Sequence, residues 1–455
     1  MVGQWLLGGH AALGSGSQLR KPSADAIAAA PGKHVGVYVM LPLWSVGDDG
    51  SLNEGMSTWL NGTKNSGADG IMVDVWWGLT EKASQVYDFM PYQQLVTMAC
   101  ALGLKVQMVA SFHQCGGNVG DDCSIPLPGF VRNNTDIWYT DAQGRQNTEY
   151  ISLWADAVKL GDGRTPLQMY AQWFQALSDA FAPSLGNTIV ELQVGLGPCG
   201  ELRYPSYYSE NGWSYPGIGQ FQCYDPHALE SLAASAPAGT NWTAPPAGLG
   251  DYNSKPSDSS AFFFQTGYKT EVGQHFLEWY SGGLIRHASE VLGEARRVFS
   301  TLPLAAKVAG MHWWYDHDSH AAELTAGYYN TNAHNAYLPI AQMLKTHDVS
   351  LDFTCMEMRN SEQSGAENNP EALVGQVARA ARDAGIELGG ENALARYDET
   401  AYEQIVEYKP VLSSFTYLRL SATLLGSGLE AFSGFVGRMQ GGAVGKEATG
   451  GRLRR

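Results

Sequence analysis

The most constraining feature of this 455-residue chain is an alternation of two kinds of segment. Short, nearly continuous apolar runs recur eight times, at residues 35–41, 70–77, 105–112, 189–196, 304–314, 350–356, 386–392 and 413–420. Continuous apolarity is typical of strands buried on both faces of a parallel sheet. Amphipathic segments lie between the runs, at residues 56–66, 92–102, 165–181, 272–300 and 370–384. The alternation predicts an α/β fold, a (β/α)8 TIM barrel, with a doubly wound sheet of about six strands as the alternative.

Two connections, after the third and fourth runs, are much longer than a plain βα loop. They cover about residues 113–188 and 197–303. Long loops on a compact barrel usually act as lids or binding walls, and barrel enzymes place their sites on the carboxyl-terminal face. We therefore expect both insertions to form a lid and a small lobe over that face. The expected organisation is a leader at residues 1–34, one barrel at 35–433 and a glycine-rich tail at 434–455.

The charge balance is acidic, with 29 basic and 45 acidic residues and a formal net charge of −16. A surface of this sign repels polyanions, so nucleic acid and anionic membranes are unfavourable partners. No apolar run reaches the about 20 residues that a membrane-spanning helix requires. No residue pattern fixes the oligomeric state, and a monomer is the expectation.

The cysteines and the leader bear on the compartment. Six cysteines are scattered without a CxxC pair, which predicts mostly free thiols in a reducing compartment and no disulfide scaffold. The leader is rich in Ala, Gly and Ser and has no continuous apolar core, so a secretory signal is not indicated. Its composition is compatible with the remnant of an organellar transit peptide or with a disordered leader.

Acidic and aromatic side chains gather where the predicted strands end. Examples are Asp74 beside Trp76 and Trp77, His113 before a glycine-rich stretch, and Glu391 beside Asn392. Aromatic residues make up 11% of the chain, more than packing alone usually needs. Sugar rings stack on aromatic faces while polar side chains bind their hydroxyls, so a neutral polyhydroxylated ligand fits this pattern. Cleaving a glycosidic bond further requires two carboxyls in opposite protonation states.

A metal site is the competing interpretation of one cluster near the fifth strand. His312, Asp316, His317, Asp318 and His320 are close in sequence. Zinc hydrolases usually draw their ligands from several strand ends, and the chain contains no HExxH motif. We therefore expect no catalytic metal and no organic cofactor.

Several long blocks carry a resemblance to a known family. They are VYVMLPL, GIMVDVWWG, SFHQCGGNVGD, GPCGELRYPSY, GMHWWY, FTCMEM, GGENALARYDE and FTYLRLS, in order from about residue 37 to residue 421. In these blocks the chain resembles the β-amylases, inverting exo-hydrolases that release β-maltose from the non-reducing end of α-1,4-glucans. The resemblance covers nearly the whole predicted barrel. It implies starch or maltooligosaccharides as substrate and maltose as product.

The resemblance also implies roles for individual residues. Glu201 in GPCGELRYPSY matches the general acid, and Glu391 in GGENAL matches the general base. Asp121 closes the GGNVGD block, which in the family is a mobile lid over the bound chain end. The other matching positions bind substrate: Asp74, His113, Lys307, His312, Thr354, Asn392, Ala393 and Arg419. An inverting pair implies carboxyls set further apart than the roughly 5–5.5 Å of a retaining pair.

Two alternatives stay open beside this interpretation. The first is a non-catalytic, glucan-binding or regulatory homologue, which the presence of both glutamates, Asp121 and the binding set disfavours. Mild departures from the family pattern, such as Cys199 and Ala395, do not touch the chemistry. The second concerns location: a starch substrate and the Ala-rich leader indicate a plastid, with the cytoplasm as the alternative.

Overall fold

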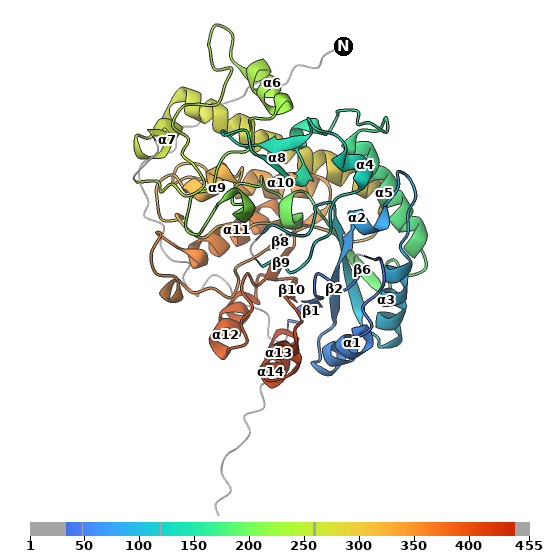
Figure 1. Ribbon diagram of the computed structural model, residues 1–455. Coiled ribbons are helices and arrows are strands. Elements are labelled where there is room, and N and C mark those ends of the chain that lie inside the picture. Colours follow the sequence, from blue (N-terminus) through green and yellow to red (C-terminus); the bar gives the residue numbers. More distant parts are fainter. Residues whose placement is uncertain (1–32, 48, 119, 258–260, 442–455) are drawn as a thin grey trace, which may run out of the picture.

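Eight parallel strands close into a barrel in a computed structural model that describes residues 33–441 apart from 48, 119 and 258–260 (Figure 1). The strands follow one another around the barrel in chain order. They are β1 (Gly36–Met40), β2 (Gly70–Trp76), β3 (Lys105–Ser111), β6 (Ile189–Val194), β7 (Leu304–Val308), β8 (Val349–Phe353), β9 (Leu388–Glu391) and β10 (Ser414–Tyr417). The predicted (β/α)8 barrel is confirmed, and the six-strand sheet is wrong. Nearly all of the predicted leader, and the tail beyond residue 441, lie outside the described residues.

Each predicted run overlaps one barrel strand, but the fifth run is much longer than its strand. β7 ends at Val308, whereas the apolar run continues to Trp314. The remaining residues are buried by the second insertion: the indole N–H groups of Trp313 and Trp314 donate to the carbonyls of Gly217 at 3.0 Å and Pro216 at 2.6 Å. Apolarity therefore reports burial here, and not strand pairing.

Helices surround the strands and match the predicted amphipathic segments (Figure 1). The five expected segments form α1 (Met56–Asn65), α3 (Met90–Ala101), α5 (Pro166–Phe181), α8 (Glu271–Val298) and α11 (Pro370–Ala384). Polar caps start three of them: Thr165 makes a capping box with Gln168, Thr270 accepts the Gly273 N–H and Asn369 accepts the Ala372 N–H. The outer layer is completed by α10 (Tyr337–Thr346), α12 (Glu399–Tyr408) and α14 (Leu429–Met439). No helix within the described residues is long and apolar enough to span a membrane.

The last helix extends the barrel beyond the expected boundary at residue 433. Helix α14 ends at Met439 and buries Phe435, Val436 and Met439. The carbonyl of Met439 accepts the N–H of Val35 at 3.0 Å, directly before β1. The expected boundary therefore falls inside a packed helix. The glycines at 434 and 437, which made this segment resemble a tail, lie on the open side of the helix, where an added Cβ would meet nothing within 4 Å.

The two insertions pack together above the carboxyl ends of the strands (Figure 1). The first contains the short helix α4 (Gly129–Arg132) and an antiparallel hairpin of β4 (Trp138–Thr140) and β5 (Gln146–Ile151). The second contains α6 (Pro226–Ser235) and α7 (Ala261–Phe264) and leads into α8. Stacked rings join the two insertions, with Trp154 and Trp279 centroids 4.4 Å apart. We call these combined segments, apart from residues 116–122, the lobe.

Candidate active site

Glu391 ends strand β9, in the sequence Gly389–Gly390–Glu391. A Cβ at residue 389 would lie 2.0 Å from Oδ1 of Asp352, so only glycine lets β9 approach its neighbour this closely. The Glu391 side chain is 1% exposed, and its Oε2 lies 2.7 Å from Nζ of Lys307 on β7. Its Oε1 has no hydrogen-bond partner in the described part of the chain. One oxygen is therefore held by a cation while the other can accept a hydrogen bond from water.

The electrostatics of Glu391 balance two opposing effects. Burial raises the pKa of Glu391, and the Lys307 ammonium opposes this rise. Burial also lowers the pKa of Lys307, but the carboxylates of Glu391 and Glu201 outweigh it and the net shift is upward. Lys307 consequently stays protonated and stabilises the ionised form of Glu391, as a general base requires.

Glu201 follows a tight turn in the second insertion. Cys199 has φ of 54° and Gly200 has φ of 74°, both in the left-handed region. The N–H of Leu202 donates to the carbonyl of Lys307 at 2.8 Å, which docks the turn onto β7 beside the lysine that pairs with Glu391. The two glutamates thus meet at one buried lysine, although they are 190 positions apart by number, from 201 to 391.

Arg203 is a partner of Glu201 that sequence reasoning missed. Its Nε lies 2.7 Å from Oε2 of Glu201, and its guanidinium lies over the ring of Tyr207, 4.2 Å from the centroid. The Arg203 side chain is 1% exposed. The Tyr207 hydroxyl also donates to Glu201 Oε2, at 3.4 Å. A charged residue two positions after the proposed acid was the only available signal, in ELRY.

Asp74, Arg419 and His113 form a second group at the ends of β2, β10 and β3. Nη1 of Arg419 lies 3.2 Å from Oδ2 of Asp74, and Ser111 donates to Oδ1 of Asp74 at 3.0 Å. His113 packs edge-on against Trp76, with centroids 5.0 Å apart. Burial lowers the pKa of His113 to about 4, with Asp74 opposing and nearby cations adding to the shift. His113 is therefore neutral near pH 6 and can both donate and accept a hydrogen bond.

His312 and Thr354 follow β7 and β8. His312 is 8% exposed, and its Nδ1 lies 2.8 Å from Oδ1 of Asn368. Burial lowers the pKa of His312. Thr354 is half-buried beside Gly310, where an added Cβ would come within 2.9 Å of the Thr354 hydroxyl. The missing side chain at Gly310 lets these two strand ends approach.

Asn392 and Ala393 are held directly behind Glu391. Asn392 Oδ1 accepts the N–H of Leu418 at 2.8 Å. The fully buried Glu357 accepts the N–H groups of Ala393 at 3.0 Å and Leu394 at 2.7 Å. Burial raises the pKa of Glu357 and these N–H groups oppose the rise. Sequence reasoning missed Glu357, although it lies in the FTCMEM block that was noted for Thr354.

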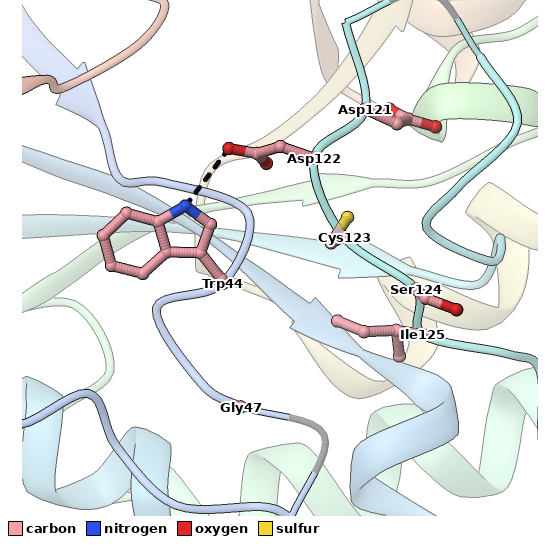
Figure 2. Close-up of a pocket in the computed structure, with 7 residues that line it drawn as sticks. All are labelled: Trp44, Gly47, Asp121, Asp122, Cys123, Ser124 and Ile125. Carbon is pink, nitrogen blue, oxygen red and sulfur yellow. Dashed lines mark hydrogen bonds between the residues drawn. The ribbon is translucent and has the colours of Figure 1, made fainter.

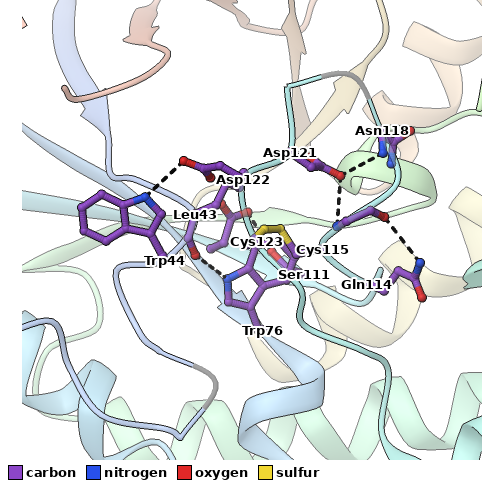
Figure 3. Close-up of a disulfide and its surroundings, with 12 residues drawn as sticks. Leu43, Trp44, Trp76, Ser111, Gln114, Cys115, Asn118, Asp121, Asp122 and Cys123 are labelled. Carbon is purple, nitrogen blue, oxygen red and sulfur yellow. Dashed lines mark hydrogen bonds between the residues drawn. A yellow bond between two sulfur atoms is a disulfide. The ribbon is translucent and has the colours of Figure 1, made fainter. Parts of the chain in front are cut away.

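The candidate lid, residues 116–122, is closed into a ring by a disulfide between Cys115 and Cys123 (Figure 3). The expectation of free thiols is wrong for this pair, whereas Cys100, Cys199, Cys223 and Cys355 are free. Cys115 and Ile125 exchange backbone hydrogen bonds of 2.9 and 3.0 Å. This bridge returns the chain on itself and brings the two cysteine Cα atoms to 5.7 Å, within disulfide range.

Asp121 is bonded within the lid itself. Its Oδ2 accepts the N–H groups of Gly116 at 3.0 Å and Asn118 at 3.1 Å (Figure 3). Burial raises the pKa of Asp121, and these N–H groups oppose the rise. On the outer side, Asp122 accepts the indole N–H of Trp44 at 3.1 Å, next to a cavity of about 470 Å³ that Asp121 also lines (Figure 2). The lid is thus tied to the loop that follows β1.

The histidine and aspartate cluster after β7 is dispersed among structural contacts. Nδ1 of His320 lies 2.7 Å from Glu323, and Nδ1 of His317 lies 2.9 Å from the Ser319 hydroxyl. Asp316 accepts from Asn369 at 2.7 Å. In the part of the chain that the structure describes, no group of three or more His, Cys, Asp or Glu side chains is placed to hold a metal ion.

The geometry brings most predicted site residues to one face of the barrel. Lys307 links the two glutamates, and Asp74, His113 and Arg419 form a contiguous polar group at neighbouring strand ends. Buried carboxyls, cations and aromatic rings at the carboxyl ends of barrel strands are typical of a glycoside hydrolase active site.

Comparison with known proteins gives the family. The chain matches glycosyl hydrolase family 14 over residues 38–445. Beta-amylase 2, chloroplastic, of Oryza sativa subsp. japonica is 50% identical over 428 residues, 89% of this chain and 77% of the relative. The beta-amylase Tri a 17 of Triticum aestivum is 45% identical and covers 89% of this chain and 86% of its own. The catalytic domain of a Paenibacillus polymyxa beta-amylase has a TM-score of 0.75 at 30% identity, over 89% of this chain and 98% of that one. The chain therefore belongs to glycosyl hydrolase family 14, the β-amylase family, and the resemblance seen in its sequence is confirmed.

Proposed function

We propose that the protein hydrolyses α-1,4-glucans from the non-reducing end and releases β-maltose with inversion, with Glu201 as general acid and Glu391 as general base. The observation that carries this proposal is the shared lysine. Lys307 holds one oxygen of a buried Glu391 and docks the Glu201 turn through its own carbonyl. Relatives named beta-amylases at 44–50% identity support the same activity.

Each proton transfer in the proposed step is assigned to one of the two glutamates. Glu391 Oε1 accepts a proton from water as the water oxygen attacks the anomeric carbon, and the carboxyl of Glu201 donates a proton to the departing glycosidic oxygen. After the step Glu391 is protonated and Glu201 is a carboxylate, which Arg203 stabilises at 2.7 Å. Proton exchange with solvent resets both groups. Lys307 favours the ionised Glu391 that starts the next cycle.

The remaining residues are proposed to bind the terminal glucose units. Asp74 and Arg419 present an acceptor and a donor side by side, as vicinal sugar hydroxyls require. A neutral His113 adds a further hydrogen bond. His312, Thr354, Asn392 and Ala393 are assigned to the neighbouring unit. Asp121 is also proposed to bind substrate, with Oδ2 held by the N–H groups of Gly116 and Asn118 and Oδ1 left to accept a sugar hydroxyl.

We also propose a plastid location and a monomeric state. Several relatives of this chain are named chloroplastic, and starch is a plastid polymer in plants. The cytoplasm is the alternative. The chemistry proposed above uses protein carboxyls and water alone.

Gel filtration with light scattering measures the mass directly, and about 49 kDa is expected for the monomer.

A proton NMR time course on maltopentaose tests the proposed activity. β-Maltose and maltotriose appearing together at early times would establish hydrolysis, attack from the chain end and inversion. An α-anomer as first product would contradict the inverting mechanism. Absence of turnover with maltose binding still measurable by calorimetry would instead favour the non-catalytic glucan-binding homologue.

A further inference from the structure

A buried carboxyl that the mechanism above does not use lies between the Glu201 turn and the lid. Glu149 is on β5, in the hairpin of the lobe, and is 0% exposed. A carboxyl is costly to bury, so one without a structural cation at hydrogen-bond distance calls for an explanation. No motif in the sequence singles out this residue.

One oxygen of Glu149 holds the turn that carries Glu201. Its Oε1 accepts the backbone N–H of Cys199 at 2.8 Å. Cys199 has a left-handed φ of 54°, a conformation that costs on the order of 1 kcal/mol for a residue with a Cβ. A hydrogen bond from this strained peptide to a carboxylate offsets that cost. Glu149 therefore sets the backbone two positions before Glu201.

The other oxygen of Glu149 faces the lid without a hydrogen-bond partner. Oε2 of Glu149 and Nδ2 of Asn118 are both buried, and neither finds a partner among the residues described. Burial raises the pKa of Glu149 to about 7, and Arg203, the Cys199 N–H and the nearby Asn118 amide oppose the rise. An unpaired acceptor and an unpaired donor thus lie near each other, one in the lobe and one in the lid.

The backbone of β5 is joined to the root of the lid as well. The N–H of Gln114, just before Cys115, donates to the carbonyl of Glu149 at 2.8 Å. The charged and titratable groups around the Glu149 carboxyl are Arg203, Asp121, Cys199 and Tyr208. Arg203 is the same guanidinium that pairs with Glu201. The Glu149 carboxyl therefore contacts the Glu201 turn at Cys199 and lies near both the lid and the guanidinium that pairs with Glu201.

We propose that Glu149 is a positioning residue that fixes the Glu201 carboxyl and couples it to the lid through Asn118; the proposal rests on the proposed role of Glu201 as general acid. In this proposal, a lid shift on substrate binding brings the Asn118 amide into hydrogen-bond distance of Glu149 Oε2. The newly satisfied pair then stabilises the turn with Glu201 aimed at the glycosidic oxygen. Lid position and acid position are set together.

Two substrates distinguish a loss of acid positioning from a general loss of catalytic activity. Maltopentaose needs a proton on its leaving oxygen, whereas α-maltosyl fluoride loses fluoride without one. At a pH above 7, where Glu149 is ionised, we expect Glu149→Gln, which keeps the size but removes the charge, to lower kcat on maltopentaose about 10- to 100-fold and kcat on the fluoride less than about threefold. Equal losses on both substrates would overturn the proposal. If Glu149→Gln does not fold, Glu149→Asp withdraws the carboxyl from Cys199 and must show the same selectivity.

Two controls make the outcomes distinguishable. Glu201→Gln must itself spare the fluoride; if it does not, the acid assignment fails together with this inference. If Glu201→Gln spares the fluoride and Glu149→Gln does not, only the role of Glu149 fails. Glu81→Gln removes an equally buried carboxylate that pairs with Arg164 outside the site, at 3.0 Å. It should affect both substrates alike.

The link to the lid has its own test. Asn118→Ala removes the amide and leaves the Cys199 contact intact, and we expect it to raise KM for maltopentaose several-fold. In the double variant with Glu149→Gln, the losses in kcat/KM should be clearly less than the product of the single losses, because both variants remove one interaction. Multiplicative losses would contradict the coupling.

Discussion

The two proposed catalytic glutamates are held by different parts of the molecule. Glu391 ends a barrel strand, is in register with Thr416 on β10 and pairs with Lys307 on β7. Glu201 lies in a turn whose contacts come mainly from the lobe and the loops around it. Glu149 binds the turn from β5, and the Tyr328 hydroxyl donates to the carbonyl of Leu202 at 2.6 Å.

This difference assigns the base to the barrel and the acid to the lobe. Strand pairing holds Glu391 whether or not the lid and lobe rearrange, since its neighbours are part of the closed sheet. Glu201 is joined to β7 through the Leu202 N–H and otherwise depends on contacts from the lobe and neighbouring loops. In a site of this kind the general base is in position before the substrate binds, whereas the general acid reaches its position when the substrate is enclosed.

The largest expected effect is the loss of either glutamate. Glu391→Gln and Glu201→Gln should each lower kcat on maltopentaose by a factor on the order of 10⁴, because each removes one proton transfer. Reducing-sugar release measures the rate, and circular dichroism checks that the fold is retained. Activity within about tenfold of the native protein in either variant would remove that residue from the mechanism.

Removing the lysine that serves the base should shift the pH profile. Glu391 acts only when ionised, so activity is lost as pH falls through its pKa. Burial raises that pKa and Lys307 opposes the rise, so Lys307→Met should raise the pKa further and move the acidic limb of kcat/KM upward by about one pH unit or more. An unchanged or lower limb would show that Lys307 does not control the base.

The lid should be sensitive to one glycine and tolerant at another. A Cβ at Gly117 would fall 1.9 Å from the Tyr208 hydroxyl oxygen, whereas one at Gly120 would meet nothing within 4 Å. Both have positive φ, so Gly117→Ala and Gly120→Ala share a backbone cost of about 1 kcal/mol. We expect Gly117→Ala alone to raise KM for maltopentaose about tenfold. Similar KM values for the two variants would mean that the lid does not rest on Tyr208.

The smallest effect is expected at the disulfide. Reduction or Cys123→Ser opens a ring spanning eight positions, which should lower the free energy of unfolding by about 2 kcal/mol. The barrel and Glu391 are untouched, so hydrolysis of α-maltosyl fluoride should change less than about twofold. Thermal unfolding with and without a dithiol reductant measures the first quantity. A large loss of fluoride hydrolysis would show that the lid also supports the base.

The barrel was predictable because its signal is local. Eight buried parallel strands require eight apolar runs, and all eight were visible. The end of β7 was not predictable, because the apolar run continues past the strand to Trp313 and Trp314, which are buried under the lobe. The β4–β5 hairpin was also missed, because its strands are short and belong to an insertion without a repeating pattern.

The site was predictable only where family blocks marked it. Glu201 and Glu391 were found through long motifs, and Lys307 was marked by the resemblance as a substrate-binding position. Arg203, Glu357 and Glu149 were missed because their importance comes from burial against distant backbone, such as the N–H of Cys199, 50 positions from Glu149. The pairing of Cys115 with Cys123 was missed for a different reason: the local bridge between Cys115 and Ile125 that brings them together has no recognisable sequence signal.

The most direct test of the division between barrel and lobe is the rate of α-maltosyl fluoride hydrolysis by Glu201→Gln and Glu391→Gln. Fluoride leaves without protonation, but water must still be activated. We predict that Glu201→Gln retains most of the native rate of fluoride hydrolysis and that Glu391→Gln loses it. The reverse order, or equal loss in both variants, would contradict the assignment of acid and base.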